Sequence, residues 1–188
     1  PGGHRLTPFR IRARDGSERW IEHMCQPVID ARGRFLGTRG TNRDVTERVM
    51  AEEQLHLAAT VFANTSEAVM ITDAENRVLT INPAFCEITG YRHGDMAGRE
   101  PRLLQCDQLD EDSYRELWAA VKSSGRWQGE ICSRRADGSN FIAWITVSTV
   151  VRDDGVHRRV ILFSDITEKK KADNLISTQA NYVHHTQV

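Results

Sequence analysis

The chain has 188 residues and a net charge of −1, and 39% of its residues are hydrophobic and 27% charged. These proportions are ordinary for a soluble globular protein of one or two domains, and so small a charge provides no long-range attraction for nucleic acid or an anionic membrane. No segment approaches the roughly 20 apolar residues of a transmembrane helix, and the N-terminus lacks the apolar core of a signal peptide.

The N-terminal residues have the pattern of three strands. Residues 5–14 and 19–29 alternate in polarity on either side of the turn-forming Asp15-Gly16-Ser17, and a third strand is predicted over 35–42. The apolar residues that this sheet would leave bare are Ile11, Ile21, Met24, Val28 and Phe35. Because folded proteins rarely expose such a face, we expect it to pack against a second chain or to need the missing half of its own domain.

After these strands the pattern becomes helical. Asp44 and Glu47 have the spacing of a helix N-cap and its capping-box partner, with Thr46 between them. An apolar stripe then follows at helical spacing, formed by Ala51, Leu55, Ala58 and Phe62. The stripe is typical of a short coiled coil, but a helix packed on its own domain has the same pattern.

A complete unit begins after this helix. A hairpin is predicted over 67–73 and 77–82, and Pro83 and Gly90 stand where a short helix would start and end. A longer helix is predicted over 110–124, because three acidic residues open it and one face is apolar. That face consists of Tyr114, Leu117, Trp118 and Val121. Three strands close the unit, at 127–135, 139–151 and 157–164.

Asp165, Thr167 and Glu168 then repeat the string of Asp44, Thr46 and Glu47, and a second Asp-Gly-Ser turn at 137–139 precedes them at nearly the same spacing. Such self-similarity indicates a duplicated module whose first copy begins partway through. Each string is predicted to join the last strand of a sheet to an outgoing helix that its Asp caps. We expect each joint to act as a two-state signalling element.

Six strings occur in order along the second copy: NPAFCEITGY, GREPRLLQ, YRELW, GRWQGEI, RRADGS and DIT. Together they resemble a PAS domain with its C-terminal PAC half, in the version that precedes GGDEF and EAL output domains in bacteria. The resemblance implies an α+β fold, with a five-stranded antiparallel sheet, short flanking helices and a pocket between them, plus helical connectors. The implied parts are an upstream PAC half, a helical connector, a complete PAS domain and an outgoing signalling helix with linker, at 1–44, 45–66, 67–165 and 166–188.

The residues offer no catalytic constellation. The sequence lacks a glycine-rich phosphate loop, a nucleophile placed beside a His and a cluster with metal-ligand spacing. We therefore expect no enzymatic activity and no metal site in this chain, although its parent protein could be a diguanylate cyclase. The four cysteines form no CxxC pair and are expected to be buried or idle thiols in a reducing, cytoplasmic compartment. They are Cys25, Cys86, Cys106 and Cys132.

The resemblance also bears on cofactors. Light-sensing relatives carry a flavin-bonding Cys where this chain has Pro101, so covalent FMN photochemistry is disfavoured because proline has no nucleophile. Haem is disfavoured because the predicted long helix contains no His, and His93 lies near a turn. FAD held without a covalent bond stays open, as do another small molecule and no ligand. By position, a flavin would contact Trp127, Asn82, Ser133 and Thr146.

These observations predict a cytoplasmic sensory and dimerisation module of a bacterial signalling protein, which regulates a GGDEF or EAL output domain in the same polypeptide. We expect a homodimer through the PAS domain and the helical connectors, and no nucleic-acid or membrane partner for this segment. Two alternatives are a ligand-free PAS spacer and the FAD-binding sensor of a histidine kinase.

Overall fold

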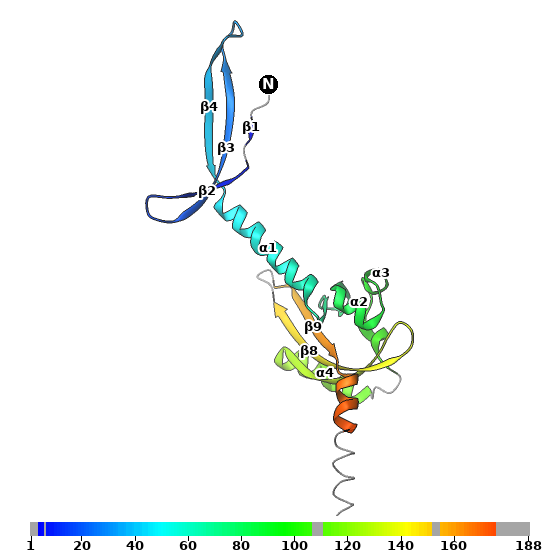
Figure 1. Cartoon of the computed structure of the whole chain (residues 1–188). Helices are drawn as coiled ribbons and strands as arrows, with labels where there is room; N and C mark the ends of the chain where they lie inside the picture. The colour runs from blue at the N-terminus through cyan, green and yellow to red at the C-terminus, as the bar shows by residue number, and fades with distance from the viewer. Residues whose placement is uncertain (1–3, 6, 107–110, 152–154, 176–188) are drawn as a thin grey trace, which may run out of the picture. The chain divides into compact units, whose positions relative to one another are not determined.

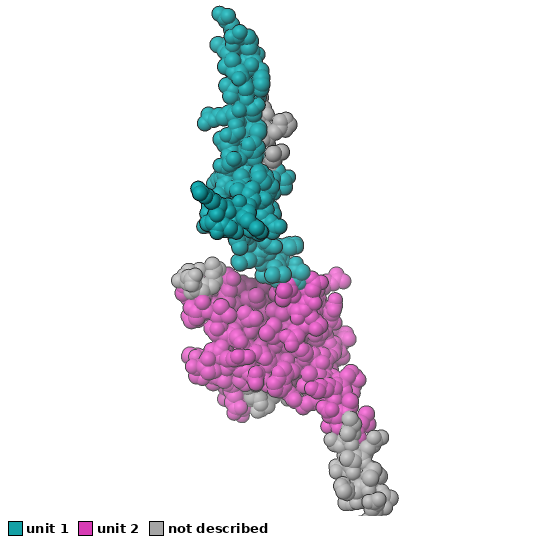
Figure 2. Space-filling model, turned by 60° about the vertical axis from the view of Figure 1, so that its left-hand side comes forward, with its two compact units in different colours: residues 1–60 teal, residues 61–188 magenta. Residues whose placement is uncertain are grey.

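The computed structural model describes residues 4–5, 7–106, 111–151 and 155–175. The chain divides into two units, residues 1–60 and 61–188, which Figure 2 distinguishes by colour. The division falls inside the predicted connector, within helix α1 (Thr46–Asn64). None of the described helices combines the length and the apolar character needed to cross a bilayer.

The first unit is built on one long strand, β3 (Glu18–Ile29). One edge of β3 pairs antiparallel with β4 (Phe35–Asp44), and the other edge pairs with the short strands β1 (His4–Arg5) and β2 (Phe9–Arg12). The predicted Asp-Gly-Ser turn joins β2 to β3. Gly16 adopts a φ of 85°, in the left-handed region that favours glycine, and the Asp15 carboxylate accepts a hydrogen bond from the Ser17 N–H.

Apolar side chains of this sheet are exposed, as the strand pattern predicts. Among the described residues of the first unit, only Glu22 and Val45 are buried. Of the predicted face, Ile21 is half-buried, whereas the other four residues are exposed: Ile11, Met24, Val28 and Phe35. Ile21 and Met24 are three positions apart in β3 and point to opposite faces, so the predicted residues are divided between the two faces of the sheet.

The second unit contains the predicted five-stranded antiparallel sheet (Figure 1). Its strands are β5 (Ala68–Thr72), β6 (Val78–Ile81), β7 (Arg126–Arg134), β8 (Asn140–Val151) and β9 (His157–Asp165). They lie in the order β6-β5-β9-β8-β7. A helix over 167–175 follows β9, and the rest of the predicted outgoing segment lies outside the described residues.

Short helices cover one face of this sheet and close the core. They are α2 (Pro83–Thr89), α3 (His93–Met96), the 3-10 helix η1 (Pro101–Leu104) and α4 (Glu111–Ser124). Helix residues such as Phe85, Met96 and Leu117 share one buried cluster with strand residues such as Ala143 and Phe163. The α+β fold with flanking short helices is confirmed.

Local sequence explains helix α2. Pro83 stands at its start, where no backbone N–H is needed, and Gly90 ends it with a φ of 76°. The N-cap is Asn82, whose Oδ1 accepts the Phe85 N–H at 2.9 Å. The helix is thus determined at both ends by residues within the segment itself.

Candidate functional site

An apolar cavity of about 80 Å³ lies between the sheet and the helices of the second unit. Helix α4 contributes Tyr114, Leu117 and Trp118, and η1 contributes Pro101 and Leu104. The sheet contributes Met70, Ile131, Phe141, Ile145, Val147, Ile161 and Phe163. The predicted apolar face of α4 is therefore confirmed, since three of its members line the cavity and the fourth, Val121, is buried.

Three polar residues interrupt this apolar lining: Gln105, Trp118 and the buried Ser133. The side-chain amide nitrogen Nε2 of Gln105 and the indole nitrogen Nε1 of Trp118 are buried, and neither has a hydrogen-bond partner within the described parts of the chain. Both groups are donors, and both residues line the cavity, so each donor can bind an acceptor atom that reaches it. Gln105 was not predicted as a site residue, because the string GREPRLLQ indicates a family and not which of its polar side chains lies in the cavity.

The residues predicted to hold a flavin do not come together. Ser133 lines the cavity. Thr146 lies on the opposite face of the sheet, because its neighbours Ile145 and Val147 line the cavity and successive strand residues alternate in direction. The assignment of Thr146 to the pocket is therefore corrected. Trp127 is half-buried against the core, but it is absent from the cavity lining.

Asn82 has a structural role that uses its whole side chain. Its Oδ1 accepts the Val69 N–H at 2.8 Å and the Phe85 N–H at 2.9 Å, and its Nδ2 donates to the Glu67 carbonyl at 2.9 Å. The residue is 1% exposed and does not line the cavity. A buried amide with all these bonds made has little capacity left for a cofactor.

The present cavity does not fit a flavin. Sites for ligands of that size class occupy roughly 300–1,000 Å³, whereas this cavity has a volume of about 80 Å³. Pro101, at the position of the flavin-bonding Cys in light-sensing relatives, lines the cavity. Within the described residues, no group of three or more His, Cys, Asp and Glu side chains is arranged to hold a metal ion.

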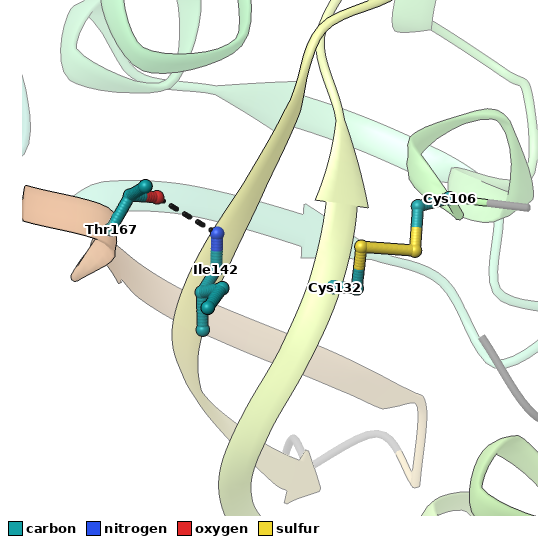
Figure 3. Close-up of a disulfide and its surroundings, with 4 residues drawn as sticks. All are labelled: Cys106, Cys132, Ile142 and Thr167. Carbon is teal, nitrogen blue, oxygen red and sulfur yellow. Dashed lines mark hydrogen bonds between the residues drawn. A yellow bond between two sulfur atoms is a disulfide. The ribbon is translucent and has the colours of Figure 1, made fainter. Parts of the chain in front are cut away.

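A disulfide joins Cys106, directly after η1 and Gln105, to Cys132 in β7 (Figure 3). The two Cα atoms are 5.7 Å apart, within the usual range for a disulfide. The expectation of four idle thiols is thus wrong for this pair, whereas Cys25 and Cys86 are free. The sequence did not predict this pairing because the two cysteines are 26 positions apart, and only the fold brings them together.

The predicted signalling joint at the end of β9 is a set of bonds between the outgoing chain and strand β8. The Asp165 carboxylate accepts the Thr167 N–H at 2.9 Å. The Thr167 hydroxyl accepts the Ile142 N–H at 2.9 Å (Figure 3), and the Ile166 N–H donates to the Ile142 carbonyl at 2.8 Å. The first turn of the helix over 167–175 is therefore tied directly to the backbone of β8.

Arg135 extends this joint to the helical layer. Its guanidinium contacts the Asp165 carboxylate at 2.5 Å, donates to the Ile88 carbonyl of α2 and lies over the Phe141 ring, 4.4 Å from its centroid. Burial alone would raise the pKa of Asp165. The hydrogen bonds from Thr167 and the Arg135 charge outweigh this effect and hold the pKa of Asp165 below its ordinary value.

The first unit repeats the same joint. The Asp44 carboxylate accepts the Thr46 N–H at 3.0 Å, and the Thr46 hydroxyl accepts the Trp20 N–H at 2.9 Å. The Val45 N–H donates to the Trp20 carbonyl at 2.8 Å. Hydrogen bonds from the Thr46 hydroxyl and N–H lower the pKa of Asp44. The repeated strings therefore fold into matching local structures, in agreement with the predicted duplication.

The predicted capping boxes are corrected. Helix α1 begins at Thr46, two residues after Asp44, so Glu47 falls in the first turn without the spacing of a capping box. The Glu168 carboxylate pairs instead with Lys171 at 2.9 Å. The physical reason lies in the residue between each Asp and Thr, Val45 or Ile166. Its N–H is bonded to the neighbouring strand, as is the hydroxyl of the Thr that follows, so each helix begins only at that Thr.

Comparisons with known proteins identify the family of this chain. A family model described as a PAS domain matches residues 66–168. The chain is 29% identical over 106 residues to the nitrogen fixation regulatory protein of Klebsiella oxytoca, covering 56% of this chain and 21% of that protein. It is 32% identical over 120 residues to the sensor histidine kinase TmoS of Ectopseudomonas mendocina, covering 62% of this chain and 12% of that protein. The chain thus spans about a fifth or less of these relatives.

The fold agrees with this match. The PAS domain of a protein from Colwellia psychrerythraea superposes with a TM-score of 0.57 at 22% sequence identity, covering 61% of this chain and 98% of that chain. At that identity the likeness concerns the fold alone. Since the family model covers more than half of the sequence and the five-stranded sheet with its helices agrees with it, the chain belongs to the PAS domain family.

Proposed function

We propose that this chain is a cytoplasmic, noncatalytic sensory module of a signalling protein, and that its cavity binds a small apolar molecule carrying a hydrogen-bond acceptor. The observation that carries the proposal is the pair of buried donors, Gln105 Nε2 and Trp118 Nε1, in an otherwise apolar lining. A buried donor without a partner costs about 1–3 kcal/mol. A ligand acceptor that reaches one of these donors would remove that donor's cost.

The size of the cavity limits the ligand. An apolar cavity of about 150 Å³ admits benzene in another protein, whereas the cavity here measures about 80 Å³. A ligand of a few heavy atoms therefore suits it better than a nucleotide cofactor. A small ketone or ester has the required combination of an apolar body and one acceptor oxygen.

The joint at Asp165 supplies a route from the cavity to the outgoing helix. Phe141 lines the cavity, and the next residue, Ile142, holds Ile166 and Thr167 through its backbone. A ligand that displaces β8 would therefore act on both bonds at the start of the helix. Such a local displacement at a strand–helix junction is a recognised basis for two-state signalling.

We propose that the output is an attached domain, with a GGDEF or EAL domain of cyclic di-GMP turnover favoured by the sequence strings and a histidine kinase as the alternative. An assay of the parent protein distinguishes them, because one output changes cyclic di-GMP levels and the other changes autophosphorylation. Thr167→Val is expected to uncouple whichever activity is present from the signal.

Matched probes test the ligand class. We expect 2-butanone to bind more tightly, by about tenfold or 1.4 kcal/mol, than 2-methyl-1-butene, which has nearly the same shape without an acceptor oxygen. Methyl shifts of Leu104 and Ile145 report binding. Trp118→Phe keeps an aromatic ring and removes the indole N–H, so it should reduce the difference to what the Gln105 donor contributes, whereas Trp144→Phe, at an exposed position, should leave it unchanged. Equal affinities for both probes in the wild-type chain would contradict the proposal.

A second function, dimerisation without sensing, is favoured by helix α1. None of its residues is buried, and its exposed apolar residues include Met50, Leu55, Leu57 and Val61. We propose that a homodimer covers them. Light scattering at increasing concentration should then report a dimer that Leu55→Glu dissociates, with Glu53→Gln as the control. A dimer that binds neither probe, and from which denaturation releases no small molecule, would indicate the ligand-free spacer.

A further inference from the structure

The position of the disulfide follows from the pairing of the segment 101–106 with strand β7. Gln105 and Ser133 form an isolated antiparallel bridge at the end of η1. In an antiparallel pair the next residue of one chain faces the previous residue of the other, so Cys106 lies opposite Cys132. Because successive strand residues point to opposite faces, the Gln105 and Ser133 side chains face the cavity and the disulfide lies on the reverse side.

This position makes the disulfide a clamp on one wall of the cavity. Strand β7 is an edge of the sheet, and the segment 101–106 joins it there through the bridge and the disulfide. The same segment contributes Pro101, Leu104 and the unpaired donor of Gln105 to the lining. Breaking the sulfur–sulfur bond leaves the bridge and the packing of the Leu104 side chain in the core cluster to hold this wall against β7.

The two cysteine residues also differ in exposure. Cys106 is 4% exposed, whereas Cys132 is partly exposed. An external thiol or disulfide therefore reaches Cys132 first, and Cys106 is placed to complete the reaction as the resolving cysteine. In a reducing compartment, disulfides are usually transient and catalytic or redox-sensing, which distinguishes this pair from a permanent crosslink.

We propose that Cys106 and Cys132 form a reversible thiol–disulfide switch, which closes the 101–106 wall of the cavity when oxidised and releases it when reduced. In oxidation by a small disulfide such as oxidised glutathione, the Cys132 thiolate attacks one glutathione sulfur and the first glutathione thiolate leaves. The Cys106 thiolate then attacks the Cys132 Sγ, and the second glutathione thiolate leaves. Two electrons pass from the protein to glutathione, and the two protons of the protein thiols end on the two glutathione thiols.

The chemistry is tested in a chain that keeps only this pair of cysteines. The variant C25S/C86A is equilibrated with glutathione buffers of increasing reduced fraction, alkylated under denaturing conditions and weighed. We expect a single two-electron transition, from no alkyl group to two alkyl groups per chain. Adding Cys132→Ser should abolish it. Failure of the intramolecular disulfide to form at any glutathione ratio would overturn the proposal.

The structural consequence is measured by hydrogen exchange in the same two states. Amides in 102–106 should exchange at least about tenfold faster after reduction, while those of β9, in the middle of the sheet, should not change. Equal exchange of 102–106 in both states would also overturn the switch.

The link to sensing and the reducing compartment both rest on the proposed function, and xenon separates the switch from ligand binding. We expect xenon to shift the Leu104 and Ile145 methyl signals with different affinity in the oxidised and reduced chain. If exchange of 102–106 responds to redox state but xenon binds in neither, the switch stands and the ligand-binding function fails. If xenon binds equally in both states and exchange is unchanged, the cavity stands and the switch fails.

Discussion

Replacement of Thr167 by Val tests the signalling joint most directly. Valine keeps the β-branched shape, so the change removes little except the hydroxyl that accepts the Ile142 N–H at 2.9 Å. That N–H is partly buried and would lose its partner, which costs about 1–2 kcal/mol. A typical domain is stable by roughly 5–15 kcal/mol. The sheet and cavity should therefore persist, while the start of the helix over 167–175 detaches from β8.

Two measurements check this prediction on the full chain. Urea unfolding should show the loss in free energy, and hydrogen exchange should show faster exchange at the Ile142 amide. Thr80→Val is the matched control. Thr80 lies on β6, and within the described residues its hydroxyl forms no hydrogen bond, so the same change of side chain removes no bond there. A Thr167→Val protein that is indistinguishable from Thr80→Val in both measurements would refute the role assigned to the joint.

Three further results are expected. Asn82→Leu leaves two backbone N–H groups and one carbonyl without their partner, so thermal or urea unfolding should show a loss of about 3–5 kcal/mol; a loss below 1 kcal/mol would contradict it. Because the pKa of Asp165 is lower in the folded chain, its contribution to stability is present above the unfolded pKa of about 3.9 and disappears as the pH falls through the folded pKa. Asp165→Asn should flatten that part of an unfolding profile from pH 7 to 2.5, and an unchanged profile would exclude the contribution. Cys132→Ser should lower stability by about 3.5 kcal/mol under oxidising conditions, for a loop spanning 26 positions, but by little under reducing conditions, where the wild-type pair is also open.

Duplication at the level of sequence corresponds to duplication of specific bonds. Trp20 in the first unit and Ile142 in the second each donate a backbone N–H to a Thr hydroxyl and accept an N–H from the residue before that Thr. The string therefore has a physical meaning beyond helix capping, because its Asp orients the Thr and its Thr holds the preceding sheet. That residues 1–44 are half of a second PAS domain stays a prediction.

Gly129, in the string GRWQGEI, explains the position of the Trp127 ring. A Cβ at Gly129 would lie 2.7 Å from the Trp127 ring, so the ring packs directly on the backbone of its own strand. The Trp-x-Gly spacing thus favours a Trp that folds along β7 rather than one that reaches a cofactor. This packing explains why Trp127 contributes to the core without lining the cavity.

Features that depend on neighbouring residues could be predicted from the amino-acid sequence. The turn at Gly16, helix α2 between Asn82 and Gly90, and the apolar face of α4 follow from backbone conformation and side-chain spacing within a few positions. The tertiary structure alone decided the contacts that depend on strand register. The alternation of side chains along β8 places Thr146 on the face away from the cavity. The bridge between Gln105 and Ser133 at the edge of the sheet brings Cys106 next to Cys132. Local propensity carries no information on register, because it results from how distant segments pack in the folded core.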